Sequence, residues 1–105
     1  MDAQLKRGLL EVCVLAAIRE EDSYGYQIIK DMSPFLTLSE STLYTVLKRL
    51  EAAALLTVRS AEHGGRLRKY YAITPAGRRR IEDFKRDWKE IESIYAFVTR
   101  EERHE

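Results

Sequence analysis

The strongest constraint on this chain is an amphipathic helical pattern followed at once by a hairpin pattern, between Leu38 and Tyr71. One face of the helical part is aliphatic at the three-and-four spacing of a helix, through Leu43, Val46, Leu47 and Leu50. The opposite face carries side chains that can bond phosphate or base edges, namely Ser41, Thr42, Tyr44, Thr45, Lys48 and Arg49. A polar helix face of this kind fits a DNA groove.

The hairpin pattern runs from Leu55–Ser60, through a turn at residues 63–65, to Arg68–Ile73. Two such runs separated by a glycine-containing turn predict a pair of antiparallel strands. The tip is basic, through Arg66, Arg68 and Lys69. A helix followed by a basic two-stranded wing predicts a winged helix-turn-helix, and hence a DNA-binding regulator.

The charge distribution supports this interpretation better than the net charge does. The net charge is only +1, which taken alone argues weakly against nucleic acid. Residues 40–71, however, hold six basic and three acidic side chains, whereas residues 1–39 hold four and six, and residues 72–105 hold eight of each. The positive excess therefore lies in the segment that is predicted to contact DNA.

Length and composition predict one folded domain, because the 105 residues are 45% hydrophobic and 33% charged. No apolar run approaches the roughly 20 residues of a membrane span, and no signal-peptide pattern is found. The single cysteine, Cys13, cannot form a disulfide within one chain. We expect a protein of the reducing cytoplasm with no membrane partner. His63 and His104 lack ligand partners at suitable spacing, so neither metal nor cofactor is expected.

The N-terminal segment predicts two helices. Leu5–Arg19 is apolar on most sides, and such a helix must be buried on more than one side. In so small a chain, that favours a second molecule on its outer face. Ser23 is the predicted N-cap of a short helix over Tyr24–Met32, which Pro34 ends because proline disfavours a helical residue before it. Ser39 is the predicted cap of the helix that follows.

A long final helix is predicted from Pro75, capped by Thr74, to about Val98. Apolar residues along it fall at spacings of 3, 4, 3, 4 and 3, the a/d pattern of a helical seam, through Ile81, Phe84, Trp88, Ile91, Tyr95 and Val98. We expect this seam to pair two copies of the chain against the first helix, where Leu9 and Val12 join the same interface.

The expected fold class is mainly α with a small β-hairpin. Residues 1–74 form a winged helix-turn-helix DNA-binding domain, with its recognition helix at about 39–53 and its wing at about 55–73. Residues 75–98 form a C-terminal dimerisation helix, and residues 99–105 a polar tail.

Several segments together resemble the PadR family of transcriptional regulators, over about residues 8–98. They are Gly8 to Glu11, Tyr24 to Ile28, Ser39 to Tyr44, Leu47 to Glu51, Gly64 and Gly65, Arg68 to Tyr71, and Thr74 to Gly77. The chain is most similar to the short-tailed subfamily, and its recognition helix and tryptophan to the multidrug-responsive repressors within it. The resemblance implies a homodimeric repressor, with the motif from Ser39 to Tyr44 and the wing from Arg68 to Tyr71 near DNA.

The sequence departs from the family at three positions. The family often has glycine where Ser41 stands and proline where Thr45 stands, which bears on the bases that are read. It usually has glycine near Ala54, which bears on the local geometry of the wing.

The candidate DNA contacts lie on the recognition helix and the wing. They are Ser39, Ser41, Thr42, Tyr44, Thr45, Lys48, Arg49, Arg66, Arg68 and Lys69. Three alternatives stay open: Tyr44 packs on the wing root, Arg49 pairs with Glu51 or Glu11, and the wing tip is merely solvated. Of Tyr70 and Tyr71, one should be buried and the other exposed, because strand residues alternate in direction.

Trp88 allows two interpretations. It is either one residue of the dimer seam, or half of a pair of tryptophans that sandwich a planar aromatic inducer across the dimer. Glu92, one turn further along, would then favour a cationic ligand, unless it pairs with Lys85 or Lys89.

The sequence thus predicts a homodimer that binds an inverted-repeat operator in double-stranded DNA and represses transcription, with release by an inducer as an open possibility. The alternative is a winged-helix module that binds another protein. That module should have an apolar or acidic recognition face, which Lys48 and the basic wing argue against. An enzyme is not expected, because the sequence offers no nucleophile–base pair, metal cluster or phosphate loop.

Overall fold

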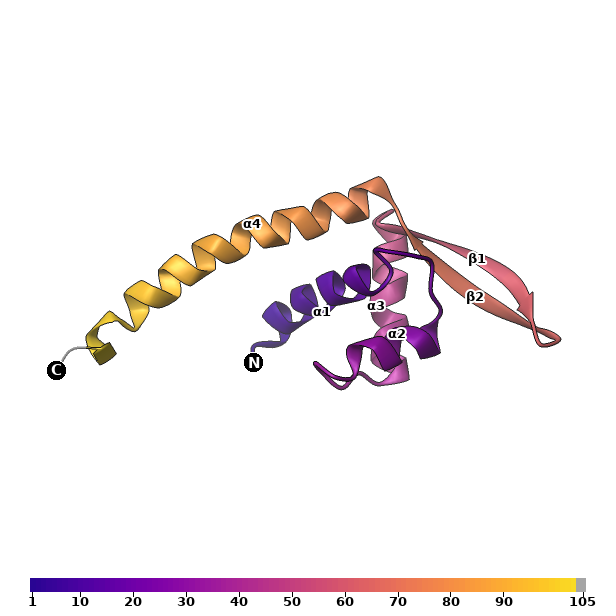
Figure 1. Ribbon diagram of the computed structural model, residues 1–105, viewed down its shortest axis with the longest axis horizontal. Helices are drawn as coiled ribbons and strands as arrows, with labels where there is room; N and C mark the ends of the chain where they lie inside the picture. Colours follow the sequence, from indigo (N-terminus) through magenta and orange to yellow (C-terminus); the bar gives the residue numbers. More distant parts are fainter. Residues whose placement is uncertain (104–105) are drawn as a thin grey trace.

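The computed structural model describes residues 1–103, so the prediction for His104 lies outside the described residues. The elements run in chain order as α1 (Ala3–Ala17), α2 (Gly25–Met32), α3 (Glu40–Ala52), β1 (Leu56–His63), β2 (Arg66–Ile73), α4 (Pro75–Val98) and the short 3₁₀ helix η1 (Arg100–Arg103). Figure 1 shows the two-stranded wing on one side of α3 and the long α4 on the other. The predicted fold class, mainly α with a small hairpin, is confirmed.

The core lies where α1, α2 and α3 meet, below the root of the wing. The predicted aliphatic face of α3 is buried in it, with Leu43 fully inaccessible and Leu47 only 2% exposed. The other elements contribute Val14, Leu15, Ile18, Ile28, Leu56 and Tyr71. Burial of each such side chain stabilises the fold by about 1.5–3 kcal/mol. This burial fixes α3 so that its opposite face points away from the protein.

Two of the three predicted helix caps are found. The Ser39 hydroxyl accepts a hydrogen bond from the Thr42 backbone N–H at 3.2 Å, and Thr74 accepts one from Gly77 at 3.1 Å. The prediction for Ser23 is wrong, because Tyr24 occupies the N-cap position of α2 and makes no side-chain cap. Ser23 is extended instead and pairs with Tyr71 through two backbone hydrogen bonds of 3.1 and 2.7 Å. The bridge to the wing therefore determines its conformation.

The wing has the predicted extent, but its two strands continue further toward the tip than predicted. Leu56 pairs with Ile73 at its root, and His63 pairs with Arg66 at its tip. Gly64 and Gly65 both have positive φ, +59° and +80°, so they make a two-residue turn that lets the ladder continue to its end. The predicted basic tip residues consequently lie within β2.

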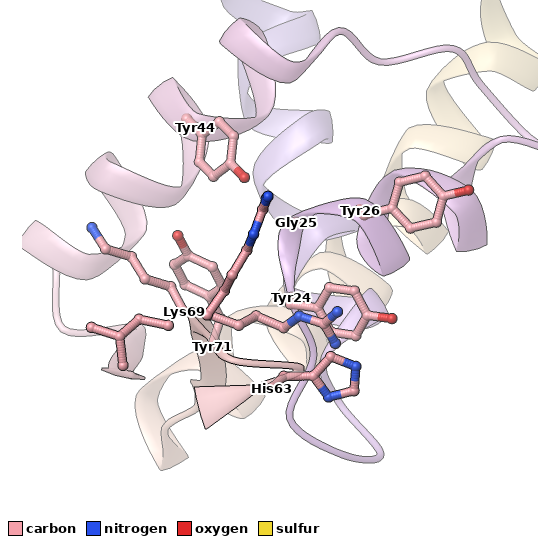
Figure 2. Close-up of a pocket in the computed structure, with 10 residues that line it drawn as sticks. Tyr24, Gly25, Tyr26, Tyr44, His63, Lys69 and Tyr71 are labelled. Atoms are coloured by element: carbon pink, nitrogen blue, oxygen red, sulfur yellow. The ribbon is translucent and has the colours of Figure 1, made fainter. Parts of the chain in front are cut away.

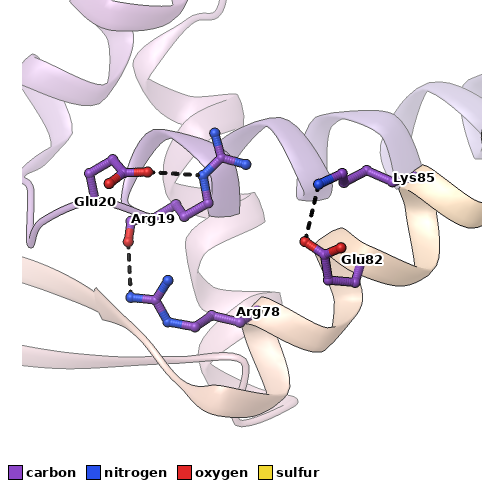
Figure 3. A network of polar contacts seen from close by, with 5 residues as sticks. All are labelled: Arg19, Glu20, Arg78, Glu82 and Lys85. Atoms are coloured by element: carbon purple, nitrogen blue, oxygen red, sulfur yellow. Dashed lines mark hydrogen bonds and ion pairs between the residues drawn. The ribbon is translucent and has the colours of Figure 1, made fainter.

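The start of α4 is fastened to α1 and to the wing root. A Cβ at Gly77 would collide with the Leu55 carbonyl oxygen, so only glycine fits at this crossing. The Arg78 guanidinium donates to the Arg19 carbonyl at 3.0 Å, at the end of α1, as Figure 3 shows. Arg19 also pairs with Glu20 at 3.4 Å. These contacts fix the direction in which α4 leaves the domain.

Beyond this crossing, α4 projects away from the domain (Figure 1). The molecule measures 65 × 26 × 22 Å, and its radius of gyration is 16.7 Å, against about 13 Å for a compact chain of 100 residues. The elongation comes from the second half of α4 at one end and from the projecting wing at the other (Figure 1). No helix among residues 1–103 has both the length and the apolar character that crossing a membrane would require.

Candidate nucleic-acid interface

The outer face of α3 is exposed, as a DNA-contacting helix requires. Ser41, Thr42, Tyr44, Thr45 and Lys48 all lie at the surface. Two of their hydroxyls are already engaged within the helix: Thr42 accepts a hydrogen bond from the Ser39 hydroxyl at 2.9 Å, and Thr45 donates to the Ser41 carbonyl at 2.9 Å. Such bonds hold these short side chains in fixed orientations on the surface.

Tyr44 crosses from α3 to the first turn of α2. Its side chain is 44% exposed, and a Cβ built at Gly25 would lie 2.5 Å from its hydroxyl oxygen. Gly25 therefore provides the space that Tyr44 needs. The ring is half-exposed and its hydroxyl lies against the start of α2, which differs from the predicted packing on the wing root, and the DNA contact stays a prediction.

Arg49 is turned away from the outer face. Its Nε donates to Glu11 of α1 at 3.0 Å, and Arg80 of α4 donates to the other oxygen of the same carboxylate at 3.2 Å. This bridge joins α1, α3 and α4, with Glu11 mostly buried. Of the alternatives for Arg49, pairing with Glu11 is therefore the one that the structure shows, and a free phosphate contact is not.

A groove of about 560 Å³ separates the first turn of α2 and α3 from the wing. It is lined by Tyr24, Gly25, Tyr26, Tyr44, His63, Arg66, Leu67, Arg68, Lys69 and Tyr71. Figure 2 shows Tyr44 entering from α3 and Tyr24 from the start of α2, with Lys69 and His63 contributed by the wing. The groove therefore combines tyrosine rings with basic side chains.

Of the two tyrosines near the root of the wing, one is buried as predicted, but the other is not exposed. Tyr71 is 5% exposed, whereas Tyr70 remains half-buried. Burial raises the pKa of the Tyr71 phenol above its ordinary value, and the neighbouring Tyr44 and Glu51 raise it further. Tyr71 is therefore a neutral part of the core, and the polar part of the groove comes from other residues.

Arg68 is not free in the way that the sequence suggested. Its guanidinium lies 3.9 Å from the centre of the Tyr24 ring and donates to the Tyr70 hydroxyl at 3.4 Å. From the neighbouring strand β1, Arg59 lies 4.8 Å from the centre of the same Tyr70 ring and pairs with Asp22 at 3.2 Å. These contacts brace the wing against the α1–α2 loop, and each cation–π contact at an exposed site is worth about 0.5–1 kcal/mol.

The sequence did not single out two basic residues beside α3. Lys6 and Arg7 of α1 share a groove of about 430 Å³ with Ser41, Thr42 and Thr45. In the sequence they belong to a helix that was interpreted only through its apolar residues. Their position depends on the packing of α1 against α3, for which no local pattern gives a signal.

The predicted dimer seam divides into a covered and an uncovered part. Val12 and Ile81 are buried within one chain, because the first turns of α4 pack on α1, so they offer little surface to a second copy. Trp88, by contrast, is 45% exposed and Val98 is 66% exposed. Ile91 and Tyr95 of the predicted seam are exposed as well, and so are Ile94 and Phe97, which the prediction did not include.

Trp88 lies at one end of an apolar groove of about 640 Å³ between α1 and α4, which Leu9 and Phe84 also line. Its indole N–H donates to Glu92 at 3.2 Å, and its ring lies 6.0 Å from that of Phe84. Lys85 pairs with Glu82 at 3.3 Å and not with Glu92 (Figure 3).

The arrangement of α2, the exposed polar helix α3 and the basic hairpin β1–β2 is that of a winged helix-turn-helix. The family model for the PadR-like transcriptional regulators matches residues 14–83. The chain belongs to this family, which is a family of transcriptional regulators and not a class of enzymes.

Individual relatives and solved structures match most of the chain. An uncharacterised protein of Lysinibacillus sphaericus is 34% identical over 94 residues, which cover 84% of this chain and 85% of the relative. The crystal structure of a PadR-like transcriptional regulator from Bacillus cereus has a TM-score of 0.76 at 30% identity, covering 98% of this chain and all of that one. Bacillus subtilis PadR, solved in complex with operator DNA, has a TM-score of 0.68 at 25% identity, covering 72% of this chain and 46% of that one.

Proposed function

We propose that this protein is a homodimeric repressor that binds an inverted-repeat operator through α3 and the wing. The proposal rests mainly on the exposed polar face of α3, which lies beside a groove with three basic wing residues. A major groove admits one helix, and a basic hairpin beside that helix can follow the phosphate backbone. Bacillus subtilis PadR was solved in complex with operator DNA, which supports DNA binding by this chain as well.

The roles within the interface follow from which side chains are free. Lys48 is the long basic side chain exposed on α3, so it reaches furthest into a groove. Tyr44, whose hydroxyl lies against α2, offers the exposed part of its ring, while Ser41, Thr42 and Thr45 lie close to the helix surface. On the wing, Arg66 and Lys69 are exposed and contact phosphate. Arg68 holds the wing in place through Tyr24, and thereby determines where those two charges lie.

A second copy of the chain covers the uncovered part of α4. Six large apolar side chains from Trp88 to Val98 are exposed in one chain. Exposed apolar surface of this extent is typical of a protein–protein interaction site. Two recognition helices related by a twofold axis would then meet DNA half-sites about one helical turn apart, roughly 34 Å. Light scattering at tens of micromolar should give the mass of a dimer, and a monomer would disprove this part.

DNA binding is tested by footprinting the purified protein on the region upstream of its own gene, followed by titration at several salt concentrations. Replacing Lys69 with Ala should reduce the slope of log K against log salt by about 0.9 for each phosphate that the variant no longer binds. Replacing Arg68 with Lys keeps the charge but removes the stacking on Tyr24, so affinity should fall while the slope stays the same. If both variants bind like the wild type, the role of the wing is wrong.

We further propose that a planar aromatic compound binds between the paired Trp88 rings of the dimer and releases the DNA. The exposed indole at the end of an apolar groove supports this, and Glu92 beside it favours a cation. Stacking and cation–π contacts contribute about 1–2 kcal/mol each in a desolvated site, so micromolar affinity is expected. A ligand releases DNA only if it binds more tightly to the dimer geometry that DNA does not select.

The inducer proposal has a direct optical test, because Trp88 is the single tryptophan. A planar cationic dye should quench its fluorescence and lower the affinity for DNA, and Trp88→Ala should abolish binding. Lys6, Arg19 and Lys85 line the same groove, so a matched anionic dye is the control for the sign of the charge. If neither dye changes the emission at a hundred micromolar concentration, Trp88 is only a packing residue.

A further inference from the structure

We propose that the N-terminal end of α1 is a further DNA-contacting element, in which Arg7 and Lys6 bind backbone phosphate beside the recognition helix. The inference rests on the proposed DNA binding and adds a third element to α3 and the wing. It starts from the groove of about 430 Å³ between α1 and α3, which these two residues share with Ser41, Thr42 and Thr45.

The order of residues around α3 places this groove opposite the wing. At 3.6 residues per turn, the exposed arc of α3 passes in sequence through Tyr44, Lys48, Ser41 and Thr45. Tyr44 lines the groove on the wing side, and Thr45 lines the groove on the α1 side. A basic element therefore borders each edge of the polar face.

This arrangement matches the surroundings of a helix in a major groove. The major groove of DNA is about 12 Å wide, and a phosphate backbone borders it on each side. The wing can follow one backbone. The other backbone would then pass close to the first turns of α1, where Arg7 and Lys6 lie.

The charges of Arg7 and Lys6 are not neutralised by the chain itself. Among residues 1–101, whose side chains the structure describes, neither makes an ion pair within 4.0 Å. The nearby acidic residue of α1, Glu11, is bound by Arg49 and Arg80. Asp2 accepts the cap hydrogen bond of the Leu5 N–H at 2.9 Å.

The two charges do not serve the stability of α1 either. The dipole of α1 favours an anion at this end, and the N-cap carboxylate of Asp2 meets that preference, so the two cations gain nothing from the dipole. A phosphate in the groove gives both side chains a partner. Arg7 carries the sharper test, because Lys6 also borders the groove between α1 and α4.

The test compares Arg7→Gln with Lys89→Gln, an equal loss of charge at an exposed position of α4, on the DNA fragment that the wild type protects. Glutamine preserves helix propensity. A dimer carries two copies of Arg7, so the salt slope should fall by about 1.8, with roughly a 30-fold loss of affinity at 0.15 M salt. Lys89→Gln should leave both unchanged, and Arg7→Lys should recover most of the slope.

The outcomes separate this inference from the proposed function. If the wild type binds its fragment and Lys69→Ala reduces the slope, but Arg7→Gln changes neither affinity nor slope, the contact by α1 is wrong and the proposed function stands. Arg7→Gln could instead weaken DNA binding and also lower the mass measured by light scattering from that of a dimer to that of a monomer. In that case the residue acts at a protein interface, and the inference is also overturned. If the wild type protects no fragment at any salt concentration, the proposed function itself fails.

Discussion

The two halves of α4 have the same apolar spacing but different surroundings. In the first half, Ile81 is 3% exposed because α1 covers it, whereas in the second half Ile91 is 41% exposed and Tyr95 69%. A helical pattern of apolar residues therefore predicts a face that must be covered, but does not say whether the same chain or another one covers it. This difference separates the core of the domain from the proposed dimer interface.

The largest effect is expected in the covered half. Ile81→Asp places an unpaired charge in the core between α1 and α4, which should cost more than about 4 kcal/mol and unfold a marginally stable domain. Loss of the helical circular dichroism signal at 25 °C checks this. Near-native stability would mean that the contact between α1 and the start of α4 is not part of the core.

The matched change in the uncovered half should act on assembly. Ile91→Asp places its charge on a surface that is open in one chain, so the domain should keep its secondary structure while the dimer dissociates or aggregates. Light scattering and circular dichroism at the same protein concentration distinguish the two effects. A variant that stays dimeric would place the interface elsewhere.

The alkylation rate of Cys13 tests whether a second chain covers the groove between α1 and α4. It borders the groove between α1 and α4, and burial raises the pKa of its thiol above the ordinary value. Because the thiolate is the reactive form, alkylation near pH 8 should be slow in the wild type and should accelerate as pH rises. Ile91→Asp should make it faster at a given pH if a second chain covers the groove, and equal rates would argue against that cover.

The smallest effect is expected at Ala54, outside the proposed dimer interface, and concerns the free energy of unfolding. Ala54 has φ = 61°, a left-handed conformation that is costly for a residue with a Cβ. Ala54→Gly should therefore raise the free energy of unfolding by about 1 kcal/mol, with no change in the dimer dissociation constant. Chemical denaturation at two protein concentrations measures both quantities. A loss of stability would mean that the entropy of glycine in the unfolded chain outweighs the strain.

The elements that follow from local chemistry could be predicted from the sequence. The caps at Ser39 and Thr74 and the buried face of α3 follow from residue types and spacing, and the structure agrees. Ala54 departs from the family's pattern, and the structure places it at a positive φ, where the family's glycine would be unstrained.

The features that depend on tertiary contacts could not be predicted in the same way. Arg49 had two possible partners in the sequence, and only the packing of α1 on α3 selects Glu11. Ser23 resembled a helix cap, but its backbone pairs with Tyr71, a residue 48 positions further along. In the sequence, Arg68 resembled a free cation of the wing. Its stacking on Tyr24 could not be predicted, because the two residues meet only once the wing and α2 are folded together.

The central claim is that the outer face of α3, flanked by basic groups, binds DNA. The most direct test is the affinity of the wild-type protein for the DNA upstream of its gene, measured between 50 and 200 mM salt and compared with a scrambled fragment of equal length. If six to ten phosphates are contacted, affinity should fall by about 10³–10⁵ over this range, and the native fragment should bind more tightly than the scrambled one at every salt concentration. Equal binding of the two fragments, or binding that does not depend on salt, would contradict the account.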